Sequence, residues 1–180
     1  MPPVILTYIR AMDAISRLFG HIASVLVLAT CLICAGNATA RYAFHGGSGW
    51  WSDIQWYLFA ATVFFGAPVL VTLNEHVRVD VLYGSRSGKT KAVIDLLGFV
   101  LFYMPLCGVM VWTSITFVHD AYVQHEVSNN AADLLRWPVK ALIPVGFGLL
   151  ILQGVAEILK RVGFLRGSYA MDTHYERPLQ

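Results

Sequence analysis

The stretch from Trp50 to Gly84 most constrains what this chain can fold into. It begins with an aromatic cluster and one acid, Asp53, and continues through about twenty almost wholly apolar residues, 54–73. At roughly 1.5 Å per residue such a helix is about 30 Å long, the thickness of the hydrocarbon core of a bilayer. The sequence then turns sharply polar over residues 74–80, Asn-Glu-His-Val-Arg-Val-Asp. Aromatic residues at one end and charges at the other fix the depth of a helix in lipid, so we predict a membrane span here.

The composition is that of a membrane protein. Of 180 residues, 57% are hydrophobic and 13% are charged, and the mean hydropathy is +0.59. A soluble domain carries about 25% charged residues. Residues 1–17 contain Arg10, Asp13 and Arg17, and the apolar run that follows is too long for the core of a signal peptide. We therefore expect no cleavable signal peptide.

Three more apolar segments are long enough to cross a bilayer. The expected spans are residues 18–40, 54–73, 92–118 and 139–159, followed by a polar tail over 160–180. The connecting loops and the tail are too short to bury a separate core. The sequence thus predicts an all-α integral membrane protein, with a single membrane domain of four transmembrane helices over residues 1–180.

Residues 3–19 predict an additional N-terminal amphipathic helix. The apolar side chains Ile5, Ile9, Met12, Ile15 and Phe19 share one face at helical spacing. Arg10, Asp13 and Arg17 are predicted on the opposite face. Such a helix can lie in the membrane interface, extend the first span or bind a partner, and we favour a simple interfacial anchor.

The basic residues predict the orientation of the chain. Four spans place both termini on one side of the membrane, together with the 74–91 loop. Ten basic residues belong to that side and three to the other, where they are Arg41, Arg136 and Lys140. Since cytoplasmic loops carry an excess of Lys and Arg, we expect a multi-pass membrane protein with both termini in the cytoplasm.

The pattern of ionisable residues argues against catalysis or transport by this chain alone. The acids Asp53, Glu75, Asp95 and Glu157 all lie within one or two turns of a span end. A transporter of polar solutes usually needs ionisable or unwound elements at mid-membrane. We therefore expect a supporting subunit that is not an enzyme, with no catalytic residue, cofactor or metal site and no nucleic-acid partner.

Two other classes of membrane protein, a thiol oxidoreductase and a haem anchor, share single features with this sequence. Cys31 and Cys34 form a C-x-x-C pair, as in a four-span, quinone-linked thiol oxidoreductase that forms disulfides. This pair lies inside an apolar run, and with Cys107 as the third cysteine a second pair is missing, so small structural thiols are the simpler interpretation. A haem anchor would require histidine pairs at mid-membrane, and His21 is near a span end without a counterpart.

The chain closely resembles the small permease subunit, the DctQ-like subunit, of tripartite ATP-independent periplasmic (TRAP) transporters. The resemblance rests on residues 74–83 directly after the second span, on the aromatic entry 50–56 and on the opening of the fourth span, 137–146. Glu126-Val127-Ser128 in the third loop also fits. Residue 53 is Asp where many members have Glu, which keeps the charge.

The resemblance implies a function and partners. In this family a large permease subunit moves the solute together with sodium, the small subunit packs on it and anchors it, and a periplasmic solute-binding protein delivers the solute, commonly an organic acid. The implied partners of this chain are therefore the large subunit, the binding protein and membrane lipid.

The resemblance also suggests residues for partner contact, each with a plainer alternative. The predicted contact residues are Asp53, Trp56, Glu75, His76, Arg78, Asp80 and Glu126. Residues 75–80 are expected to dock the large subunit, although a solvated cap with local salt bridges explains the same charges. Glu126, with His125 and Asp133, is expected to meet the binding protein, although an ordinary solvated loop is an equal alternative.

Overall fold

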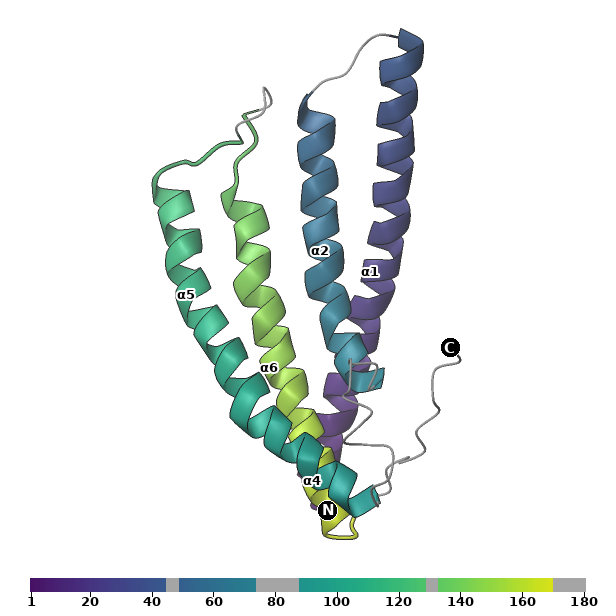
Figure 1. Ribbon diagram of the computed structural model, residues 1–180, viewed down its shortest axis with the longest axis vertical. Helices are drawn as coiled ribbons and strands as arrows, with labels where there is room; N and C mark the ends of the chain where they lie inside the picture. The colour runs from purple at the N-terminus through teal and green to yellow at the C-terminus, as the bar shows by residue number, and fades with distance from the viewer. Residues whose placement is uncertain (45–48, 74–87, 129–132, 170–180) are drawn as a thin grey trace.

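The computed structural model describes residues 1–44, 49–73, 88–128 and 133–169. These residues form α1 (Pro3–Phe44), α2 (Gly49–Leu73), α4 (Gly88–Gly98), the π-helical segment η1 (Phe99–Tyr103), α5 (Met104–Val123) and α6 (Trp137–Leu165). Apart from one isolated β-bridge, Val127 to Leu135, the described residues contain no strand. Figure 1 shows the long helices running roughly side by side, with α4, α5 and the intervening η1 forming one continuous rod.

The prediction of an all-α membrane protein is confirmed. Four helices are long and apolar enough to cross a membrane, with mean hydropathies of 1.8 to 2.3 in their most apolar windows. Each predicted span lies within one of them. The fourth helix continues to Leu165, a turn and a half past the predicted span end at residue 159.

The predicted N-terminal amphipathic segment, residues 3–19, is not a separate helix. It continues without a break into the first span as part of α1. α1 has 42 residues, about 63 Å of helix, and is therefore about twice as long as a hydrocarbon core is thick. Ile9 of the predicted apolar face is buried, whereas Ile15 is 37% exposed. The predicted placement of Asp13 is wrong: it does not share an outer face with Arg10 and Arg17 but reaches Lys160 of α6. The reason is a charge partner on α6 that local periodicity cannot reveal.

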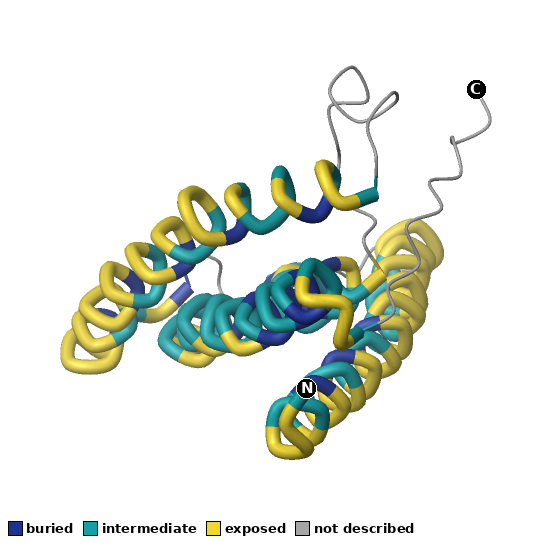
Figure 2. Tube along the Cα trace, turned by 90° about the horizontal axis from the view of Figure 1, so that it is seen from below, coloured by how far each residue is buried: buried dark blue, intermediate teal, exposed yellow. Residues whose placement is uncertain are grey.

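Helix α6 is the centre of the fold. It contacts α1, α2, α4, η1 and α5, and 28% of its apolar stretch is buried, against 6 to 11% in the other three spans. Figure 2 shows the consequence: long exposed surfaces run along the outer sides of the flanking helices. The four spans therefore form an open array centred on α6. Most of the apolar surface of this array faces outward.

Small residues bring α6 and α2 close to their neighbours. At Gly146 of α6, an added Cβ would lie 2.6 Å from the ring of Phe64 of α2, so only glycine fits there. At Gly20 of α1 an added Cβ would lie 3.0 Å from Val69 of α2, which is also tight. Gly66 of α2 lies opposite Ala23 of α1 at an ordinary contact distance, 3.6 Å for an added Cβ, so this surface of α2 is packed on α1.

The third span contains a π-helical turn just before Pro105. Proline has no N–H for the carbonyl one turn earlier and its ring crowds that carbonyl, so a wider turn in front of it relieves the conflict. In this turn the Phe99 and Tyr103 rings lie 5.0 Å apart, and the Tyr103 hydroxyl donates to the Leu150 carbonyl at 3.1 Å. The π turn therefore fixes two aromatic side chains against α6.

Candidate functional site

The seven predicted partner-contact residues are only partly within the described structure. Glu75, His76, Arg78 and Asp80, the core of the sequence motif, lie outside the described residues. Trp56, Asp53 and Glu126 are described, and they do not form one site. Trp56 and Asp53 belong to α2, and Glu126 lies in the segment after α5.

Trp56 belongs to an exposed apolar stripe on α2. Its side chain is 68% exposed and meets the Phe59 ring edge-on, with the ring centroids 6.4 Å apart. The other members follow at helical spacing on the same face: Phe59, Val63 and Leu70 are 54%, 50% and 45% exposed. We call these four residues the α2 stripe. The stripe is the surface that α2 leaves open after packing on α1 and α6.

Asp53 is buried in the first turns of α2, with 5% of its surface exposed. A carboxylate there is favoured by the positive end of the helix dipole. Within this chain Asp53 is therefore an internal group, unlike Trp56 three residues later.

Glu126 anchors a group of charges that we call the loop cluster: Glu126, Arg136 and Lys140. Its carboxylate accepts hydrogen bonds from Arg136 Nη1 at 3.1 Å and from Lys140 Nζ. The Lys140 ammonium also lies 3.8 Å from the centroid of the Phe117 ring. The backbone supports this arrangement, because Arg136 N donates to Glu126 O and Ser128 N donates to Leu134 O, both at 2.8 Å.

The segment that carries the loop cluster contacts α2 as well as α5 and α6. Two residues have a left-handed backbone, His125 at φ 48° and Asp133 at φ 45°. Each stands two positions before a partner of the β-bridge between Val127 and Leu135. The hydroxyl of Tyr57 on α2 donates to the Leu135 carbonyl at 2.9 Å. The described part of this segment therefore connects α5 and α6 to α2 through the Leu135 carbonyl.

The loop cluster predicts a pH dependence. Hydrogen bonds from Lys140 and Arg136 lower the pKa of Glu126 from its ordinary value of 4.5. A lowered folded-state pKa stabilises the fold above the ordinary value, and this contribution is lost as the pH falls through the lowered pKa. We expect Glu126→Gln to lower the thermal unfolding midpoint at pH 7, with a difference from wild type that shrinks steadily below pH of about 4.5. Asp120→Asn is the control, since Asp120 is 58% exposed and, among the described residues, its ion pair is with His119. A difference that stays constant down to pH 3, or an equal effect of Asp120→Asn, would contradict the role of these ion pairs.

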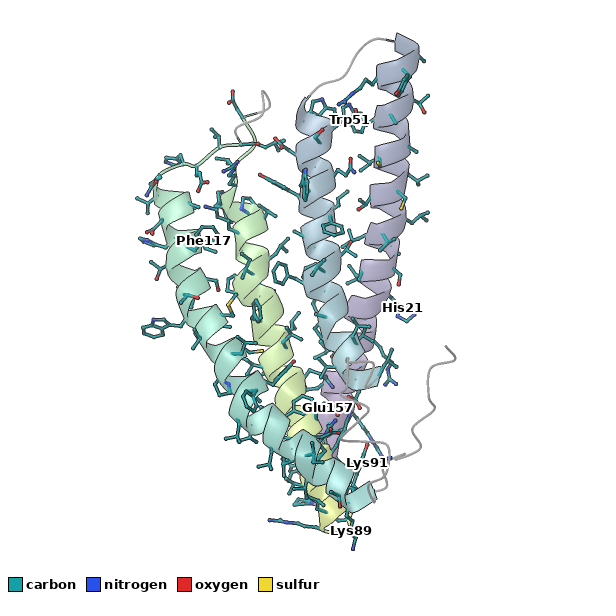
Figure 3. The ribbon with its side chains drawn as sticks, in the orientation of Figure 1. His21, Trp51, Lys89, Lys91, Phe117 and Glu157 are labelled. Atoms are coloured by element: carbon teal, nitrogen blue, oxygen red, sulfur yellow. The ribbon has the colours of Figure 1, made fainter. Side chains whose placement is uncertain are left out.

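A second charged group lies at the opposite end of the helices, where α1 and α4 meet the last turns of α6. We call it the terminal cluster: Asp13, Asp95, Glu157, Lys160 and Arg161. Lys160 Nζ donates to Asp13 Oδ1 and to Glu157 Oε1, both at 2.7 Å. Arg161 donates to Glu157 Oε2 at 2.5 Å and to Asp95 Oδ2 at 3.3 Å. Figure 3 shows Glu157 at this end, where α1, α4 and α6 come together.

The terminal cluster is deeply buried for a group of charges. Arg161 is 0% exposed and Glu157 is 2% exposed. Arg161 also lies over the Phe99 ring of the π turn, with its Cζ atom 4.5 Å from the ring centroid. Next to the charges, Gln153 accepts from Ser16 at 2.8 Å and donates to Asp13 at 3.0 Å. Buried charges need such pairing, so the cluster fixes the positions of α1, α4 and α6 relative to one another.

Reasoning from sequence missed the terminal cluster. Lys160 and Arg161 were counted as charges flanking a span, and Asp13 as part of an outer polar face. One local signal was present: Glu157 precedes Lys160 and Arg161 at the i,i+3 and i,i+4 spacings that pair on a helix. The contacts to Asp13 and Asp95 join residues 147 and 66 positions apart and carry no local signal.

The two charged clusters connect helices to one another, and none of the three cysteines belongs to either cluster. Cys31 and Cys34 are exposed on α1, while Cys107 is buried. In the described part of the chain the two ionic clusters lie at the two ends of the helices, and both are paired internally. The geometry suits a membrane scaffold whose outward surfaces are apolar.

Comparison with known proteins identifies the family. Residues 29–163 match the family model described as "Tripartite ATP-independent periplasmic transporters, DctQ component", well over half of the 180 residues. No curated protein and no solved structure matched the chain. The matched segment contains the α2 stripe, the loop cluster and the part of the terminal cluster contributed by Asp95, Glu157, Lys160 and Arg161. The chain therefore belongs to the DctQ family of TRAP transporter components.

Proposed function

We propose that this protein is the small membrane subunit of a TRAP-type secondary transporter, packing on and anchoring a large permease subunit. The complex takes up an organic acid, coupled to sodium and delivered by a periplasmic solute-binding protein. The family match over residues 29–163 carries this proposal. The paired charges at the helix ends and the open array of helices support it, since they suit a scaffold better than a solute pathway.

The surface proposed to receive the large subunit is the α2 stripe. It combines two aromatic and two aliphatic side chains, each 45% exposed or more, on a helix that is otherwise packed between α1 and α6. Large aromatic side chains contribute strongly at packed interfaces. The motif at residues 74–83 follows directly on the end of α2 at Leu73, so a partner on the stripe would also reach the motif. Its residues Glu75, His76, Arg78 and Asp80 remain predicted contacts.

The stripe can be tested by co-purification. We expect Trp56→Ala with Phe59→Ala to lower recovery of the co-expressed large subunit about tenfold or more, because two anchoring side chains are lost. The matched control is Trp112→Ala with Phe102→Ala, which removes the same two residue types from the third span. There the Trp112 side chain is 79% exposed and the Phe102 side chain is 76% exposed. The control should recover the large subunit like wild type. Equal recovery with both pairs, or a loss only with the control, would rule out the stripe as the docking surface.

The proposed orientation places both termini and the 74–91 loop in the cytoplasm of a bacterial cell. It rests on the excess of basic residues at that end. In a background with all three cysteines replaced, we expect His119→Cys to react with an impermeant thiol reagent on intact spheroplasts and Lys89→Cys not to react. Both positions are exposed in the folded chain, so access is decided by the membrane side. Labelling of Lys89→Cys alone would show that the chain has the opposite orientation.

A further inference from the structure

We propose that the outer face of α1 near its N-terminus binds the phosphate headgroup of an anionic phospholipid through Arg10 and Arg17. Both side chains are exposed, and neither makes an ion pair with any residue that the structure describes. The two residues lie two helical turns apart, about 10 Å along the axis and on nearly the same side of the helix. Ala14 lies between them and leaves room for a bound group.

The terminal cluster explains why this face is purely cationic. Asp13, the acid between the two arginines in sequence, is turned inward and paired with Lys160 of α6 at 2.7 Å. The other acids nearby in the fold, Glu157 and Asp95, are held by Arg161. Because these acids are paired with Lys160 and Arg161, Arg10 and Arg17 have no counter-charge of their own on α1, so an external anion is the group that complements them.

The rest of the same face fits a lipid rather than a soluble anion. Beyond Arg17 the outer side of α1 becomes apolar, with Leu28 61% and Leu32 64% exposed. At about 100° per residue, both lie within about 60° of Arg17 around the helix. Figure 3 shows His21, one turn after Arg17, pointing away from the bundle on this side. Cations followed along one face by exposed aliphatic side chains match a phosphate headgroup followed by acyl chains.

This inference is independent of the proposed transport function. Arg10 and Arg17 lie before residue 29, where the family match begins. The proposed lipid occupies the leaflet on the side of the two termini, whichever compartment that side faces.

Native mass spectrometry of the full chain in neutral detergent tests the proposal, with phosphatidylglycerol and phosphatidylcholine titrated separately. We expect preferential binding of phosphatidylglycerol. Arg10→Gln with Arg17→Gln should weaken it about tenfold or more, because each basic residue near an anionic lipid contributes substantially. The control pair Lys89→Gln with Arg166→Gln removes two other exposed cations from the same end of the molecule and should stay within about twofold of wild type.

Two further variants and one competitor sharpen the test. Arg10→Lys with Arg17→Lys keeps the charges and should retain most of the binding, and circular dichroism should show unchanged helix content for every variant. Equal binding of the two lipids, or equal weakening by the control pair, would overturn the proposal. Displacement of phosphatidylglycerol by inorganic phosphate at similar concentration would overturn it too, because the site would then bind a soluble anion.

Discussion

Arg161→Met is expected to lower the free energy of unfolding by about 3–5 kcal/mol, the cost of leaving buried charges uncompensated. Arg161 is 0% exposed and is hydrogen bonded to both Glu157 and Asp95, so its loss removes the buried guanidinium that these two carboxylates share. The contact of the guanidinium with the Phe99 ring is lost as well. Unfolding in mixed micelles, followed by tryptophan fluorescence, measures the change.

Two comparisons separate the charge effect from the loss of side-chain volume. Arg166→Met removes an exposed arginine directly after the end of the same helix and should change the free energy of unfolding by less than about 0.5 kcal/mol. Adding Glu157→Gln to Arg161→Met should recover part of the loss, since it removes one of the two carboxylates that shared the lost guanidinium. If the double variant is no more stable than Arg161→Met, the cluster does not act through its charges.

Local features of the sequence were enough to predict the membrane helices. Runs of apolar residues identified all four spans, because a bilayer demands a length of about twenty apolar residues whatever the neighbours are. Pro105 lies beside a π turn, a distortion for which proline gives a physical reason. The length of α1 was left open, since residues 3–19 carry both an amphipathic pattern and no break before the first span.

The polar interactions inside the fold could not be predicted, because they depend on residues far apart in sequence. Asp13 was assigned to the outer face from its neighbours Arg10 and Arg17, yet Lys160 draws it inward. Glu126 was predicted as a partner contact or a solvated residue, and the structure shows it paired with Arg136 and Lys140 within its own chain. Each outcome was decided by packing between helices that local patterns do not specify.

The division of labour within the transporter leads to the second large effect. The buried charged residues that the structure describes, Asp53, Glu157, Lys160 and Arg161, lie toward the helix ends, so the described part of the chain offers no buried charge at mid-membrane with which to carry a polar solute. The proposed function therefore requires a partner: the chain alone should not transport, and the large subunit without its anchor should lose most of its uptake.

Uptake into reconstituted vesicles measures this most directly, using the organic acid that the cognate binding protein carries. Vesicles receive the large subunit, this chain or both, with the loaded binding protein outside and an inward sodium gradient. We predict uptake only with both membrane subunits, loss of uptake when the sodium gradient is abolished, and a background signal from this chain alone. Solute uptake by this chain alone, or undiminished uptake by the large subunit without it, would contradict its role as a supporting subunit.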